Sequence, residues 1–119
     1  MVAIDLTRIA EEIERLERRW ASLYREVPSA ERAEVRWTAS GRTLRWHVCL
    51  EDVVEPDIDV EILPRVLVIR ARRDTHPESL LLALLPVPSD FDVEQPRLYW
   101  EFGYLEVRLS RRSGGGAQQ

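Results

Sequence analysis

The apolar residues at the start of the chain recur every three or four positions, which is the period of an α-helix. Glutamates and arginines fill most of the positions between them. This pattern predicts an amphipathic helix over residues 1–28 with two apolar positions per heptad. Pro28 ends the helix, because the residue before a proline avoids the α region. The apolar positions are Val2, Leu6, Ile9, Ile13, Leu16, Trp20, Leu23 and Val27.

Two interpretations of this helix stay open on the sequence alone. The helix can pack on its own domain, or it can pair with a second chain. A stripe of two apolar positions per heptad is narrower than most globular helices show, so pairing is a genuine alternative. The residues that would form an oligomerisation helix are Leu6, Ile9, Ile13, Leu16, Trp20 and Leu23.

From Val35 onward the pattern changes to a period of two, which is typical of half-buried β-strands. Short strand-like segments separated by turn residues predict an all-β fold over residues 29–112, an immunoglobulin-like antiparallel β-sandwich of about seven strands. Three consecutive glycines within residues 113–119 predict a disordered tail. The predicted strands are 35–38, 43–50, 58–62, 66–71, 80–85, 98–102 and 105–109.

The segment 80–85 is apolar at every position. A strand of an antiparallel sandwich is expected to have one solvated face. Something must therefore cover its second face: the N-terminal helix of the same chain, a partner chain, or a client protein. We favour the helix, because its own apolar stripe also needs a cover.

Several segments, in order, resemble the alpha-crystallin domain of the small heat-shock proteins. The segments LEDV (50–53), EPDIDVEI (55–62) and VLVIRA (66–71) resemble the first half of that domain. Leu85 and Pro86 resemble its central leucine–proline, and GYLEVRL (103–109) resembles its closing strand. The chain departs from the family at two points. The connection 73–79 is too short for a strand that swaps into a partner, because seven residues span at most about 25 Å. Residues 110–119 contain no isoleucine for the family's C-terminal plug.

The resemblance implies an ATP-independent chaperone that holds unfolding proteins. It also implies a hydrophobic groove between the segments 58–62 and 98–102, which would accept an extended client segment. The groove residues would be Ile58, Val60, Ile62, Leu98 and Trp100; the plainer interpretation is that they are core residues. The short connection is closer to the CS-domain co-chaperones, so the alternative is a small dimeric adaptor that binds one specific protein partner.

The composition argues against an enzyme. All 17 basic residues are arginines, so Schiff-base chemistry and a phosphate-loop lysine are excluded. His47 and Cys49 share one strand face but lack further ligands for a metal. Asp57, Asp59 and Glu61 are explained by a solvated strand face. We therefore predict no catalytic residue, no metal and no cofactor.

The partners and compartment follow from charge and cysteine content. A net charge of −4 gives no indication of nucleic acid or membrane as a partner. A single cysteine fits a reducing compartment, and residues 1–10 show no secretory signal, so we expect a cytoplasmic protein. The expected partners are unfolding or specific client proteins, with the chain itself a homodimer or small homo-oligomer.

Overall fold

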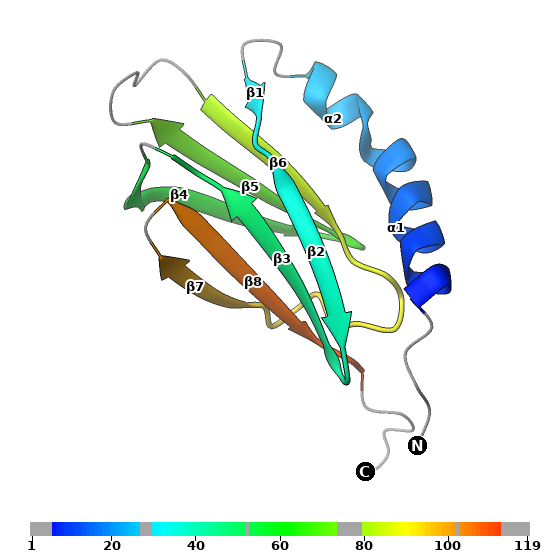
Figure 1. Ribbon diagram of the computed structural model, residues 1–119. Coiled ribbons are helices and arrows are strands. Elements are labelled where there is room, and N and C mark those ends of the chain that lie inside the picture. The colour runs from blue at the N-terminus through cyan, green and yellow to red at the C-terminus, as the bar shows by residue number, and fades with distance from the viewer. Residues whose placement is uncertain (1–5, 27–29, 52, 74–79, 102, 113–119) are drawn as a thin grey trace.

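The computed structural model is a two-layer β-sandwich with a helix along one side (Figure 1). It describes residues 6–26, 30–51, 53–73, 80–101 and 103–112. The predicted tail 113–119 and most of the short connection 73–79 lie outside these residues. The helices are α1 (Leu6–Trp20) and α2 (Ser22–Arg25). The strands are β1 (Glu31–Arg32), β2 (Val35–Ser40), β3 (Thr43–Cys49), β4 (Val53–Leu63), β5 (Val66–Arg73), β6 (Leu80–Pro86), β7 (Arg97–Glu101) and β8 (Tyr104–Ser110).

The strands form two four-stranded sheets. Sheet A has the order β1-β6-β5-β4, and sheet B has the order β2-β3-β8-β7. The predicted sandwich is confirmed, and the seven predicted strands are all present. The two-residue strand β1 was not predicted. It pairs with β6 in parallel through its backbone, and both of its side chains are exposed, so it leaves no alternation to detect.

The core lies between the sheets, where the inward side chains of both sheets meet. Leu44, Trp46 and Val48 of β3 are fully buried there, as their alternation predicts. The Trp46 indole N–H donates a hydrogen bond to the carbonyl oxygen of Pro86 at 3.1 Å, which satisfies its one polar atom and joins sheet B to sheet A. The inward faces of β5 and β6 complete this central core.

The hairpin of β2 and β3 turns more tightly than the sequence suggests. Strand β2 extends to Ser40, so only Gly41 and Arg42 connect it to β3. Gly41 has a φ of 61°, a backbone conformation that a residue without Cβ adopts at little cost. Arg65, in the predicted turn between β4 and β5, has a φ of 66°, which is uncommon for a residue with a side chain.

The N-terminal helix packs on its own chain. Ile9 and Ile13 are buried in the central core, and Leu16 is also buried. The predicted continuous helix is interrupted at Ala21, between α1 and α2, and Leu6 points to solvent with 52 % of its surface exposed. Apart from Leu6, the described part of the apolar stripe is thus packed within the chain, while a role for these residues in assembly stays a prediction.

A second apolar cluster covers the outer face of sheet A. Val66 and Val68 of β5 and Leu82 and Leu84 of β6 are buried there. Trp20, Leu23 and Tyr24 pack on them from the end of α1 and from α2. The helical segment is therefore the cover that the doubly apolar strand 80–85 requires.

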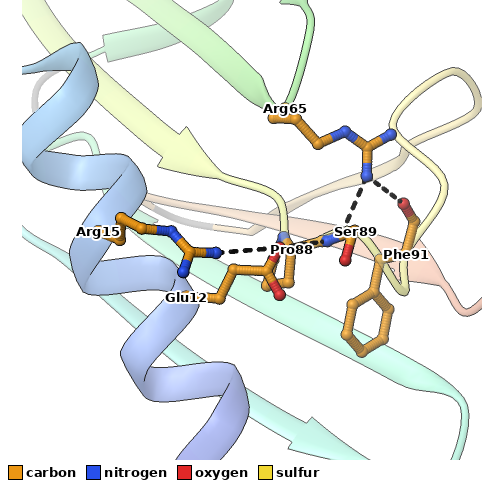
Figure 2. A network of polar contacts seen from close by, with 6 residues as sticks. All are labelled: Glu12, Arg15, Arg65, Pro88, Ser89 and Phe91. Carbon is orange, nitrogen blue, oxygen red and sulfur yellow. Dashed lines mark hydrogen bonds and ion pairs between the residues drawn. The ribbon is translucent and has the colours of Figure 1, made fainter.

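Polar contacts tie the helix to the loop that leads from sheet A to sheet B (Figure 2). A Glu12 carboxylate oxygen accepts a hydrogen bond from the backbone N–H of Ser89 at 2.8 Å, and Arg15 lies 4.0 Å from the same carboxylate. From the other side, the Arg65 guanidinium donates to the carbonyl oxygens of Pro88 at 3.2 Å and Phe91 at 3.3 Å. The loop is therefore held from both α1 and the β4–β5 turn.

The burial of Ile13 predicts a specific loss of stability. The substitution Ile13→Ala removes a side chain that is 2 % exposed and should lower the free energy of unfolding by about 2–5 kcal/mol. The matched control Leu6→Ala, at the exposed first residue of the same helix, should change it by about 0.5 kcal/mol or less. Urea unfolding measures both values. Equal effects of the two substitutions would contradict packing of α1 on its own sheets.

Candidate functional site

The two sides of the sandwich are closed to different degrees. Helix α1 runs along the side formed by β6 and β2, and its apolar residues enter the core there (Figure 1). The edge strands of the other side are β4 of sheet A and β7 of sheet B, and no helix of the described residues lies along them. We call the inward apolar side chains of these two edge strands the open rim. They are Ile58, Val60, Ile62, Leu98 and Trp100.

The β4 part of the open rim faces the core but is incompletely covered. Ile58, Val60 and Ile62 lie opposite Ala71, Ile69 and Leu67 of β5, all of which are buried in the central core. Ile58 and Val60 pack against that core while remaining half-buried. Ile62 has 46 % of its surface exposed. The exposure follows from the edge position, because β4 has a neighbouring strand on one side only.

The β7 part of the open rim has the same character. Trp100 lies opposite Leu105 of β8 and packs against the core while half-buried. Leu98 lies opposite Val107, which is fully buried, yet 46 % of its own surface is exposed. The five residues named from the sequence therefore share the inward side of two edge strands. Their function as a binding groove stays a prediction.

The outward face of β4 is acidic and partly neutralised. Asp57, Asp59 and Glu61 are all exposed. Arg70 of β5 lies 2.8 Å from a Glu61 carboxylate oxygen and 3.8 Å from one of Asp59. These ion pairs fit the interpretation of a solvated strand face.

His47 and Cys49 lie on the outward face of sheet B, as their alternation predicts. The His47 Nε2 atom lies 3.0 Å from a Glu106 carboxylate oxygen. Arg108 pairs with the same carboxylate and also stacks over the Tyr99 ring, 4.2 Å from its centroid. Together with Trp100, Glu101 and Tyr104, these residues line a shallow recess of about 450 Å³, and Cys49 lines a neighbouring one. Within the described ranges there is no group of three or more histidine, cysteine or acidic residues placed to hold a metal ion.

The Glu106 carboxylate is stabilised in its charged form. Partial burial raises its pKa, but the hydrogen bonds from Arg108 and His47 and their charges together lower it more. The net pKa therefore lies below its ordinary value. A carboxyl group whose pKa is lower in the folded state stabilises the fold above its unfolded pKa, and this contribution is lost as the pH falls through the folded value.

This sign predicts a pH dependence that can be assigned to one residue. The free energy of unfolding should decrease as the pH falls from about 5 to about 3, since the unfolded carboxyl titrates near 4.3. The substitution Glu106→Gln should make this decrease smaller. Glu101→Gln, on the exposed part of the same face, is the control. Urea unfolding at several pH values tests it, and equal slopes for wild type and Glu106→Gln would refute the assignment.

Three structural contacts were not foreseen from the sequence. The Tyr24 hydroxyl accepts a hydrogen bond from the backbone N–H of Leu84 at 3.1 Å. Burial raises the pKa of Tyr24, although this hydrogen bond acts to lower it. Glu12 and Arg65 hold the loop between the sheets. Each contact joins residues at least 23 positions apart, so only the fold brings the partners together.

The fold has clear relatives among solved structures. Heat shock protein 16.0 from Schizosaccharomyces pombe superposes with a TM-score of 0.68 at 14% identity, over 90% of this chain and 89% of that one. HSP18.5 from E. histolytica superposes with a TM-score of 0.64 at 11% identity, over 75% of this chain and 96% of that one.

A small heat-shock protein from Xylella fastidiosa, described as having a distinct high order structure, gives 0.62 at 14% identity, over 73% and 92% of the two chains. The chain therefore has the β-sandwich fold of the small heat-shock proteins, the alpha-crystallin type. No protein-family model and no curated protein matches the sequence. Neither helix in the described part of the chain is long and apolar enough to cross a membrane.

Proposed function

We propose that this protein is an ATP-independent chaperone that holds unfolding proteins by binding their extended apolar segments at the open rim. The observation that carries the proposal is the unequal closure of the sandwich. One side is sealed by α1, whereas the other leaves Ile62 and Leu98 nearly half exposed beside a packed core. Neither a catalytic group nor a cofactor takes part in this function.

The rim offers a client segment two kinds of contact. Edge strands β4 and β7 each have one side without a neighbouring strand, so their backbones can pair with an extended segment. Alternate apolar side chains of that segment can then cover the half-exposed rim residues. Burying one such side chain contributes about 1.5–3 kcal/mol, so a few contacts give weak and reversible binding. Reversible binding needs no nucleotide hydrolysis.

The rest of the surface suits a chaperone that must stay dispersed while loaded. The chain has 17 arginines and 21 acidic residues, and many of them lie exposed on α1 and on the outward strand faces. Interspersed charges of both signs oppose further association of a complex that already carries an apolar client. We place the client contact on the rim, because the helix stripe is occupied within the chain. Assembly into a homodimer or small homo-oligomer is part of the same proposal.

The double substitution Ile62→Ser and Leu98→Ser tests the rim. It removes exposed apolar surface, so it should abolish most of the suppression of client aggregation. Because each side chain is about half buried, it should also lower the thermal unfolding midpoint by several degrees, and the suppression is measured well below that midpoint. Light scattering of a heat-aggregating client at an equimolar ratio measures the suppression. Tyr104→Ser is the matched control, since Tyr104 is 51 % exposed but lies on the outward face of sheet B. Equal suppression by wild type and the double variant would refute the rim as the site.

The second candidate function is an adaptor that binds one specific partner at the same rim. The open rim is small, with five side chains on two strands, and a surface of this size favours an adaptor. Two unrelated clients separate the two functions. A chaperone suppresses the aggregation of both, whereas an adaptor suppresses neither.

A further inference from the structure

The outward face of sheet B carries three arginines in one row across adjacent strands. Arg45 of β3 lies opposite Arg108 of β8, and Arg108 lies opposite Arg97 of β7. Neighbouring strands are about 4.8 Å apart, so the backbones of this row span about 10 Å. Like charges directly opposite one another destabilise a sheet. The row is therefore a local cost in the isolated chain.

Among the three arginines of the row, only the central one has its charge compensated by a neighbouring side chain. Arg108 pairs with Glu106 and stacks on Tyr99. Arg45 is exposed and Arg97 is exposed, and neither forms an ion pair with the residues that the structure describes. On one side of the row the outward neighbours carry hydroxyl groups: Thr38 lies opposite Arg45, and Ser40, Thr43 and Ser110 form the next row. On the other side the one carboxylate of the adjacent row His47, Glu106 and Tyr99 is that of Glu106, which is already paired with Arg108 and His47. We call Arg45, Arg97 and Arg108 the arginine platform.

The opposite charge gathers on the other sheet. Residues 51–61 contain six acidic residues and no basic one. Within that stretch, Asp57, Asp59 and Glu61 are exposed on the outward face of edge strand β4. The basic residues that face them are Arg70, which pairs with Glu61 and Asp59, and Arg72 on the same strand β5. Asp57 forms no ion pair with any residue in the described ranges. The face keeps an excess of negative charge.

We propose that the arginine platform of one copy binds the acidic outward face of β4 of a second copy. The two surfaces belong to different sheets, and both point away from the core, so one chain cannot bring its own surfaces together. Three carboxylates at alternate positions of a strand span about 13 Å, which long arginine side chains extending from a 10 Å row can reach. A contact between two different surfaces joins copies head to tail, and it forms a ring or an open chain.

This contact uses outward side chains, whereas the open rim uses inward ones. It therefore goes beyond the proposed client binding and is tested separately. Exposed ion pairs are individually weak and are screened by salt. The assembly should for that reason depend on protein concentration and on ionic strength.

A charge-swap series on the full chain tests the proposal. Arg45→Glu with Arg97→Glu reverses the platform, and Asp57→Arg with Asp59→Arg reverses the acidic face. The four substitutions together exchange the two charges. Arg18→Glu with Arg25→Glu, on the helices, is the control with the same change in net charge as the platform variant. Sedimentation velocity measures mass at several concentrations, in about 50 mM and about 500 mM NaCl. Circular dichroism and thermal unfolding confirm that each variant is folded.

The proposal expects wild type and the helix control to self-associate at low salt and to dissociate at high salt. Each reversed variant alone should raise the dissociation constant about tenfold or more. Mixing the two reversed variants, or combining all four substitutions, should restore association. A monomeric wild type, unchanged masses in the reversed variants, or no restoration would each overturn it. If a monomeric wild type binds a labelled single-stranded oligonucleotide through the arginine platform, the platform binds nucleic acid and the proposal is likewise overturned. Client suppression is scored independently, so the two proposals can fail separately.

Discussion

A strand without a polar face must be covered on both sides, and β6 imposes this requirement on the whole molecule. Its inward side chains join the core between the sheets, while Leu82 and Leu84 form part of the outer apolar cluster. Helices α1 and α2 of the same chain cover this outer cluster, because Trp20 and Tyr24 pack on it. Tyr24 also supplies an acceptor for the Leu84 N–H, beyond the short stretch where β1 pairs with β6. A buried backbone donor without a partner costs roughly 1–3 kcal/mol, so the hydroxyl removes a real penalty.

Because the helical segment packs on this side, no described element covers the edge strands β4 and β7 on the other side. The same segment enters the core between β6 and β2 and then bends over sheet A, so it cannot also shield β4 and β7 (Figure 1). The incomplete burial at these two strands is thus a consequence of topology, not of weak packing, since their neighbours Ile69 and Val107 are fully buried. The open rim, to which we assign the proposed client binding, and the sealed helical side are two results of one arrangement.

The sequence was a good guide wherever a residue's environment depends on its own strand. Alternation placed Leu44, Trp46 and Val48 in the core. The uniform apolar run 80–85 indicated that the outer face of its sheet needs a cover, which the helical segment provides. The sequence did not predict the contacts that depend on how distant strands pair. The row of Arg45, Arg97 and Arg108 requires the register of β3, β8 and β7. Strand β1 pairs through its backbone alone, so its two residues carry no pattern. The five rim residues were found because edge strands still alternate, but alternation cannot tell half-buried from fully buried.

The contact between Glu12 and the Ser89 N–H gives the molecule a built-in reporter (Figure 2). Ser89 is an exposed residue of the loop between the sheets, and no strand ladder protects its amide. Its amide hydrogen can exchange with deuterium whenever the helix lifts away, even while both sheets stay intact. Local openings of this kind occur far more often than global unfolding. Rotation of the Glu12 side chain alone also frees this amide, so its exchange rate, divided by the intrinsic rate, sets an upper limit on the fraction of time that the sandwich spends without its helical cover.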